Sequence, residues 1–230
     1  MTPASAKPAR RARGSMSAAE ILDTAKRLIE RDGIRRLSMP LLAKELGSGV
    51  TSIYWYFRSK DDLLEALTAE VLRDMHRQLP PVGDGPWEDE LLAYFVAFRD
   101  LLEAYPVYRE INAGRPHLQF VQPTKAMLER LEAGLSLLVR AGLTPEQATA
   151  AFTACTNFAR GHVALQHGVD REVRLASEDR LVRLEDFPTL SAMHPTVDEL
   201  VPLDEDHFVL GLRLMIVGIR QTYLAGPTTG

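Results

Sequence analysis

A short segment of the chain concentrates hydroxyl and aromatic side chains that could recognise DNA. Its members are Thr51, Ser52, Tyr54, Trp55 and Tyr56. Serine and threonine hydroxyls can bond phosphates or base edges, and a tyrosine hydroxyl can bond phosphate. The major groove of B-DNA admits one α-helix. These groups could therefore read DNA if they stood on a helix face that the protein core leaves uncovered.

The alternative for such a cluster is a place in the hydrophobic core, where aromatic side chains at helical spacing usually lie. Trp55 and Tyr56 are adjacent, however, so they cannot both face the same interior. Ile53 and Phe57 are spaced i, i+4 and are expected to turn inward instead. The expected core partners of that pair are Ile21, Leu41, Leu42 and Leu46. The residues left facing outward are Thr51, Ser52 and Trp55, and partly Tyr54 and Tyr56. Arg58 and Lys60 follow the helix, where phosphates should lie.

The elements that would position this cluster form a helix-turn-helix. A first helix is expected to start at Ser17, because Ser17 and Glu20 make an S-x-x-E capping box, and to end at Gly33. Ser38 can cap a second helix, and Gly47-Ser48-Gly49 gives the turn after it. A third helix is expected over about 50–57 and a fourth over about 61–79.

The rest of the chain also predicts helices. Apolar residues recur at helical spacing over about 87–105, 124–141, 144–168 and 204–224. Residues 169–203 are expected to be mostly loop, with room for one short helix, and no segment has a strand pattern. The predicted fold class is all-α, with an N-terminal helix-turn-helix three-helix domain and a C-terminal helical bundle. The expected boundaries are a disordered basic arm at 1–16, a DNA-binding domain at 17–62 and the bundle at 63–230.

Charge is divided unevenly along the chain. Residues 1–60 hold 12 Lys or Arg against 5 Asp or Glu, a net +7, and the remainder holds 15 against 26, a net −11. Such a split favours a basic part that faces nucleic acid and an acidic part with another role. The arm contributes Lys7, Arg10, Arg11 and Arg13. Two interpretations of the arm stay open, a DNA contact and a solvated tail.

Signatures of other protein classes are missing from the sequence. There is no G-x-S-x-G, no phosphate loop, no C-x-x-C and no H-E-x-x-H, and the six histidines are scattered. We therefore expect no enzyme activity and no cofactor. Asp204 and His207 are expected to mark a helix start with a surface histidine. No run nears the roughly 18 apolar residues of a membrane span, no signal peptide is evident, and Cys155 is the only cysteine. These features predict a cytoplasmic protein.

From about Glu20 to Glu70 the chain resembles the DNA-binding domain of the tetracycline-repressor (TetR) family. The matching positions are Ala25, Leu28, Gly33, Leu37, Leu42-Ala43, Leu46-Gly47, Ser52, Tyr54, Phe57, Lys60, Leu63-Leu64 and Ala66. The operator contacts that the resemblance implies are Thr51, Ser52, Tyr54, Trp55, Tyr56 and Lys60. Pro40 stands where the family's namesake has a base-reading arginine, and proline cannot replace a guanidinium contact. A different operator is therefore implied.

Beyond residue 80 the chain resembles the family's ligand-binding domain more weakly. The matching positions are Phe98-Arg99, Gly114-Arg115-Pro116, Ala141-Gly142-Leu143, Phe158 with Gly161, and Gly211-Leu212. The resemblance implies a ligand-binding and dimerisation domain whose last long helices pair with a second copy. A mostly small-residue helix face favours this homodimer, and a two-fold dimer suits a palindromic operator. That face consists of Ala148, Ala151, Phe152, Cys155, Ala159 and Val163. The alternative is that it is buried inside the monomer.

The resemblance also implies a pocket for a small molecule. The residues at or beside the family's pocket are His76, Tyr94, Phe98, Arg115, Phe152 and Asn157. The metal-holding histidine falls near Ile111 or Asn112, and the acidic residue near the metal falls on Leu165, which offers no oxygen ligand. We therefore expect no metal and no magnesium–tetracycline inducer. An apolar or aromatic ligand is favoured by Tyr94, Phe98, Phe120, Phe152 and Phe158.

The predicted function is a ligand-responsive transcriptional repressor that binds a palindromic operator as a dimer. Ligand binding would move the helix at 61–79, change the spacing of the two recognition helices and shift the population away from the DNA-binding form. Two alternatives are a helical enzyme, which the missing motifs disfavour, and a helical interaction protein that does not bind DNA, which the basic N-terminal part disfavours.

Overall fold

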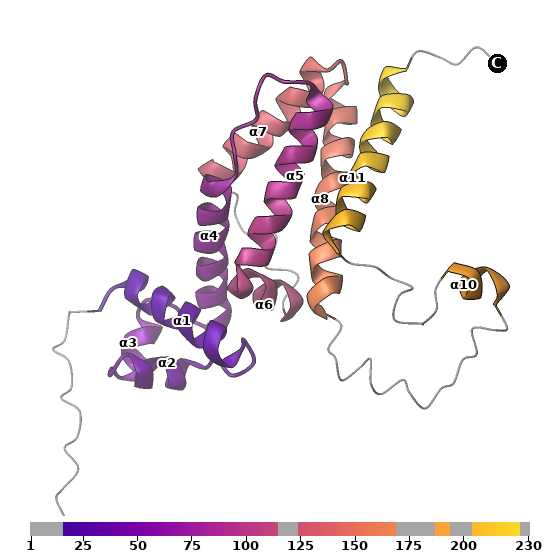
Figure 1. Ribbon diagram of the computed structural model, residues 1–230. Helices are drawn as coiled ribbons and strands as arrows, with labels where there is room; N and C mark the ends of the chain where they lie inside the picture. Colours follow the sequence, from indigo (N-terminus) through magenta and orange to yellow (C-terminus); the bar gives the residue numbers. More distant parts are fainter. Residues whose placement is uncertain (1–15, 115–123, 169–186, 194–203, 226–230) are drawn as a thin grey trace, which may run out of the picture. The chain divides into compact units, whose positions relative to one another are not determined.

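The computed structural model describes residues 16–114, 124–168, 187–193 and 204–225, and in these ranges the regular structure is helical, without a strand (Figure 1). The all-α prediction is confirmed. The predicted arm lies outside these ranges except for Met16, and so does Arg115. Among the helices of the described ranges, none is long and apolar enough to cross a membrane.

The helices follow the predicted order along the chain. They are α1 (Ala18–Asp32), α2 (Met39–Glu45), α3 (Val50–Tyr54), α4 (Lys60–Gln78), α5 (Trp87–Ala104), α6 (Pro106–Gly114), α7 (Lys125–Arg140), α8 (Pro145–Gly168), α10 (Pro188–Met193) and α11 (Glu205–Ile219), which continues into a π-helical turn at Arg220–Leu224. The chain divides into two compact units. The first unit takes in Met1–Gln78 and Leu102–Glu129, and the second takes in Leu79–Leu101 and Arg130–Gly230. The first unit therefore contains α4 as well as the helix-turn-helix, and the predicted boundary at residue 62 stays a prediction.

Local signals at the helix ends explain why the first unit begins and turns where it does. Ser17 is the N-cap of α1 and its hydroxyl accepts from the N–H of Glu20 at 3.1 Å, as the capping box predicts. Gly33 ends α1 with φ of 79°. Ser38 caps α2 by accepting from the N–H of Leu41 at 3.3 Å. Gly47 has φ of 62°, a conformation that side chains with a Cβ rarely adopt, so it can make the sharp turn between α2 and α3.

The core of the first unit fixes the orientation of the short helix α3. Helix α1 packs against α2, α4 and α6, and α2 packs against α3. The side chains of Ile21, Leu42 and Ile53 are all 0% exposed. A helix of five residues is too short to be stable alone. Packing of α3 on α2 and burial of Ile53 therefore determine which side of α3 faces out.

The second unit buries the helix face that was expected to pair with another copy. Helices α8 and α11 lie side by side (Figure 1). The small-residue face of α8 is covered within the chain itself: Cys155 and Ala159 are 0% exposed, and Phe152 is 7% exposed. The prediction that this face forms the dimer interface is therefore wrong. Small residues permit close packing of helices whether the partner helix belongs to the same chain or to another, and here α8 uses them within its own chain.

Candidate nucleic-acid interface

Helix α3 presents an uncovered surface at the end of the helix-turn-helix. We call Thr51, Ser52, Tyr54, Trp55 and Tyr56 the α3 surface. All five side chains are exposed, with Trp55 87% exposed, Tyr54 46% and Tyr56 44%. The two inward residues are Ile53, 0% exposed, and Phe57, 8% exposed. The division of faces that the i, i+4 spacing predicts is what the structure has.

The end of α3 differs slightly from the expectation. The helix ends at Tyr54 and not at Phe57, because Trp55 and Tyr56 form a turn. The N–H groups of Tyr56 and Phe57 both bond to the carbonyl of Ile53, at 2.9 and 3.0 Å. The turn is thus held onto the one fully buried residue of the helix, which keeps Trp55 pointing out.

Tyr56 has a hydrogen bond that the sequence did not predict. Its hydroxyl donates to the backbone carbonyl of Met16, 40 residues earlier in the chain. No local sequence pattern links these two positions, so the sequence gives no sign of this hydrogen bond. The bond places Met16, two residues before the start of α1, beside Tyr56, the last residue of the α3 surface.

Lys60, just past the end of α3, makes two hydrogen bonds within the first unit. Its Nζ donates to the carbonyls of Leu37 at 2.6 Å and Ile34 at 3.1 Å, in the turn between α1 and α2. It thereby ties the start of α4 to the connection that leads into α2. The structure gives Lys60 a bracing contact, and its predicted contact with DNA stays a prediction. Arg58, also near the end of α3, has an exposed side chain.

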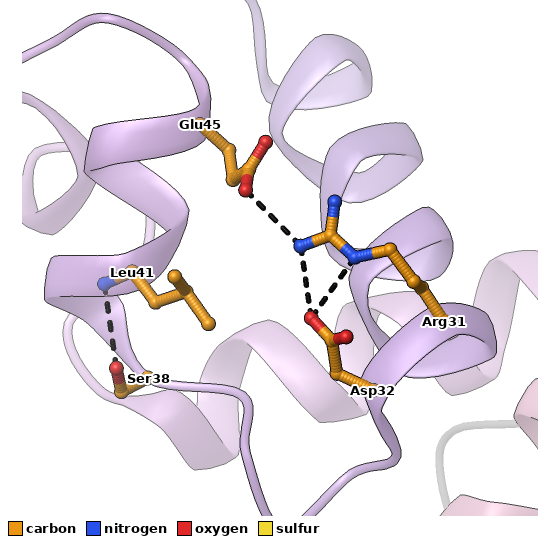
Figure 2. A network of polar contacts seen from close by, with 5 residues as sticks. All are labelled: Arg31, Asp32, Ser38, Leu41 and Glu45. Atoms are coloured by element: carbon orange, nitrogen blue, oxygen red, sulfur yellow. Dashed lines mark hydrogen bonds and ion pairs between the residues drawn. The ribbon is translucent and has the colours of Figure 1, made fainter.

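An ion-pair network outside the α3 surface joins α1 to α2 (Figure 2). Nη2 of Arg31 lies 2.8 Å from Asp32 Oδ2 and 3.1 Å from Glu45 Oε1. The hydrogen bond from Arg31 holds the pKa of the Asp32 carboxyl below its ordinary value. The network pairs opposite charges at the C-terminal ends of α1 and α2. Because these ion pairs are exposed, we expect them to orient the two helices more than to stabilise them.

In the second unit four aromatic side chains form a buried cluster. Its members are Tyr94, Phe95, Phe98 and Phe152. The ring centroids of Tyr94 and Phe95 each lie within 5.6 Å of that of Phe152. Burial raises the pKa of the Tyr94 phenol to about 12, so the ring stays neutral at physiological pH. Gly134 of α7 packs against this cluster, since a Cβ built there would lie 2.3 Å from Cε2 of Phe152.

The six predicted ligand-site residues do not all share this environment. Tyr94, Phe98 and Phe152 belong to the aromatic cluster. Asn157 is exposed, and it lies five residues after Phe152, which turns it by about 140° around the helix axis. His76 is buried in the first unit, where its Nδ1 lies 2.6 Å from the carbonyl of Leu72.

A second, mostly buried group lies around Phe208 of α11 and was not predicted. Phe158 stacks on Phe208 with centroids 5.3 Å apart, and the ring of His162 lies 5.0 Å from it. The guanidinium carbon of Arg99 lies 5.0 Å from the Phe208 centroid, which is a cation–π geometry. Arg99 also pairs with Glu205 at 3.5 Å. Among the described residues, no group of three or more His, Cys, Asp and Glu side chains could hold a metal ion.

The short exposed helix, held by a turn onto a three-helix core, is the architecture of a helix-turn-helix DNA-binding protein. Residues 21–67 match the family model described as "Bacterial regulatory proteins, tetR family", and residues 79–223 match "Tetracyclin repressor-like, C-terminal domain". The chain belongs to the tetR family of bacterial regulatory proteins. The family consists of transcriptional regulators, which confirms the expectation that the chain is not an enzyme.

Individual relatives and structures agree with this assignment. An HTH-type transcriptional repressor of Mycobacterium tuberculosis is 39% identical over 158 residues, 68% of this chain and 59% of that protein. The chain thus spans less than two thirds of that relative's length. The tetracycline repressor protein class C of Escherichia coli is 30% identical over 70% of this chain and 71% of its own. The crystal structure of a possible TetR family regulator from Streptomyces coelicolor, 25% identical, has a TM-score of 0.69 over 89% of this chain and 99% of that one.

Proposed function

We propose that the protein is a transcriptional repressor that binds a palindromic operator as a homodimer and is released by an apolar or aromatic small molecule. The observation that carries the proposal is the α3 surface, above all the 87% exposed indole of Trp55. A large aromatic side chain that the fold leaves in water is typical of a surface that a partner covers in function. An operator-binding protein of this kind acts with the chromosome in the bacterial cytoplasm.

The dimer proposal rests on the exposed face of α8 and α11. Leu210, Leu214 and Val217 are 53, 65 and 49% exposed and recur at i, i+4 and i+7, so they form one apolar stripe along α11. Leu165 of the adjacent helix α8 is 55% exposed. An apolar stripe that no other described part of the chain covers is typical of a surface for another protein. A second copy related by a two-fold axis would cover it and would present two α3 surfaces to a two-fold symmetric DNA site.

The ligand proposal rests on the chemistry of the second unit. The aromatic cluster around Phe152 would offer an apolar, π-rich lining, with few polar groups to orient a ligand. Tyr94 is the polar member of that cluster. Of the other predicted contacts, Arg115 and His76 stay predictions, and Asn157 would need the partner copy or a rearrangement to meet the ligand. The positions of Ile111 and Leu165 still argue against a magnesium chelate.

Release would follow from a population shift. A ligand that binds the DNA-incompetent form more tightly lowers operator affinity only by its differential affinity for the two forms. A hundredfold effect therefore requires about 2.7 kcal/mol of coupling. Helix α4, which belongs to the same compact unit as α3, would be the element whose movement reaches the DNA-binding surface.

The DNA-binding claim is tested by removing aromatic side chains from the α3 surface. Trp55→Ala combined with Tyr56→Ala should lower affinity for a duplex selected from a random-sequence pool by about 30-fold or more, on the order of 2 kcal/mol or above. The measurement is a gel-shift titration. Unchanged affinity in a folded variant would refute the claim. Leu128→Glu, at an exposed leucine of α7 in the first unit that is 49% exposed, serves as a surface control.

The dimer claim is tested on the stripe of α11. Leu214→Glu should leave the chain folded, because Leu214 is 65% exposed, and should convert the dimer to a monomer in light scattering. Leu128→Glu makes the same chemical change in the first unit, to which neither α8 nor α11 belongs, and should leave the dimer intact. If the Leu214→Glu protein were still dimeric, the proposal that the α11 stripe forms the dimer interface would be wrong.

A further inference from the structure

The buried residue Ile53 defines which side chains of α3 point most directly away from the core. Successive residues of an α-helix are turned by about 100° around its axis. Thr51 and Trp55 lie two positions before and two after Ile53, so each is turned about 160° from it. Trp55 follows the last residue of α3 but keeps helical angles, φ of −68° and ψ of −32°. Both side chains are exposed, and we call these two residues the leading edge of α3.

The side chains of α3 differ from those that read most bases in the major groove. Guanine is read by arginine or lysine, adenine by asparagine or glutamine, and cytosine by aspartate or glutamate. Residues 47–57, G-S-G-V-T-S-I-Y-W-Y-F, contain none of these six residue types. Among the groups that bases present there, the C5 methyl of thymine is the apolar one. Thymine is therefore the base that side chains of this kind can best distinguish.

The exposed cations nearest to α3 in the chain occupy other positions. Lys44 belongs to α2, and the first helix of a helix-turn-helix crosses the DNA backbone. Arg58 follows the turn at the C-terminal end of α3, whereas the N-terminal residues of a recognition helix contact the base edges. These cations are thus suited to phosphates, and base discrimination is left to the first turn of α3.

Thr51 offers two groups that complement thymine. It is the second residue of α3, within the part of a recognition helix that meets base edges. Its Cγ2 methyl can pack on the C5 methyl of thymine, and its Oγ1 hydroxyl can donate to the O4 acceptor. Because the side chain is β-branched, few rotamers are open to it, and the methyl is held in place before binding. The indole of Trp55, one turn further along the leading edge, would exclude water from this contact.

We propose that α3 reads its operator through thymine methyl groups, with Thr51 as the specificity-determining residue. Each half-site would then carry thymine at the position that faces Thr51. The inference rests on the proposed function, since it requires α3 to enter the major groove. It deepens that function by naming the base that the surface selects and the chemical group by which it selects it.

The thymine contact is measured by replacing thymine with uracil in the DNA. Uracil keeps every hydrogen-bonding group of thymine and lacks only the C5 methyl. The full chain is titrated by fluorescence anisotropy with a pool-selected duplex and with versions that carry uracil at one symmetric pair of thymine positions at a time. Affinity should fall about 3- to 4-fold for each methyl that the protein buries. Replacing guanine with 7-deazaguanine, which lacks the N7 acceptor, should cost less than the uracil replacements.

Unchanged affinity for every uracil duplex would overturn the inference while leaving the proposed function intact. Larger losses with 7-deazaguanine than with uracil would also overturn it, because guanine would then be the base that is read. A full chain that binds no selected duplex would instead overturn the proposed function.

The role of Thr51 is measured by a double-mutant cycle between protein and DNA. Thr51→Ser removes the Cγ2 methyl and keeps the hydroxyl. It should weaken binding to the thymine duplex about 3- to 4-fold, and uracil at the facing position should then cost nothing more, because both changes remove the same contact. An equal uracil effect in the native and Thr51→Ser proteins would overturn the assignment to Thr51. Thr149→Ser makes the same chemical change at an exposed residue of α8 in the second unit and should keep the full uracil effect.

Discussion

The two units of this protein use aromatic side chains in opposite ways. In the first unit Trp55 is 87% exposed at the end of a five-residue helix that buries Ile53 alone. In the second unit Phe95 is 0% exposed and lies against three other rings. Both groups follow helical spacing in the sequence. What separates an exposed aromatic surface from a buried core is therefore the length of the helix and the packing of other helices around it.

Arginine shows the same contrast. Arg31 in the first unit forms exposed ion pairs, with its side chain 57% exposed, and such pairs add little stability. Arg99 in the second unit is 9% exposed, lies over the Phe208 ring and pairs with Glu205. A buried guanidinium needs these partners, because without them its charge would lack solvation. The first unit thus exposes aromatic and arginine side chains to solvent, whereas the second buries the same kinds of side chain between its helices.

The comparison is tested most strongly by removing one ring from each unit. Phe95→Ala should lower the free energy of unfolding by about 3–5 kcal/mol, because it empties a packed site. Trp55→Ala should change it by less than about 0.5 kcal/mol, as is usual at an exposed position. Urea denaturation followed by circular dichroism measures both. Similar losses in the two variants would mean that Trp55 is part of a core and would remove the distinction.

The next largest expected effect is on the unfolding free energy of a Lys60 variant. This variant tests whether Lys60 holds the first unit together or contacts DNA. Lys60→Met removes a charged donor from two carbonyls and should cost about 1.5–3 kcal/mol of unfolding free energy. Arg58→Met, at a neighbouring exposed cation, should leave stability within about 0.5 kcal/mol and weaken DNA binding. If Lys60→Met instead kept full stability and weakened only DNA binding, Lys60 would be a phosphate contact as the family resemblance implies.

The packing of the second unit is tested at Gly134. A methyl group at Gly134 would meet the Phe152 ring at 2.3 Å, so Gly134→Ala should cost about 1–3 kcal/mol. The smaller side chain in Phe152→Leu should relieve the clash, and the double variant should be more stable than the sum of the two losses predicts. Additive losses in urea denaturation would show that the ring and the glycine do not press on each other.

The sequence predicted local features well, because they depend on nearby residues. The caps at Ser17, Ser38 and Asp204 follow from hydroxyl and carboxylate groups just before apolar periodic runs, and all three accept the expected N–H. The outward face of α3 followed from Ile53 and Phe57. These inferences needed only the helical period and the chemistry of helix ends.

The sequence could not predict features that depend on distant packing. Helix α11 is apolar on several sides, so its pattern does not separate Phe208, which is buried, from Leu214, which is exposed. The small residues of α8 permit close packing on any helix, so the sequence does not show whether the partner helix belongs to the same chain or to a second copy. The bond from Tyr56 to Met16 joins residues 40 positions apart, and nothing local indicates it.

The smallest expected effect is a difference in pH dependence between two helix caps, Asp204 in the second unit and Ser17 in the first. Asp204 caps α11 in the second unit, and the N–H of His207 lowers the pKa of its carboxyl, with a further contribution from the His207 ring. A lowered folded-state pKa means that the cap stabilises the fold above the unfolded value of about 3.9 and that this stabilisation is lost as pH falls through the folded value. The difference in unfolding free energy between the native protein and Asp204→Ala should therefore shrink between about pH 5 and about pH 3. Ser17 has no proton to titrate in this range, so the cost of Ser17→Ala, about 1 kcal/mol, should stay constant over the same range. If the two differences had the same pH dependence, the Asp204 cap would act through hydrogen bonding alone, and the charge of its carboxylate would contribute nothing to holding α11.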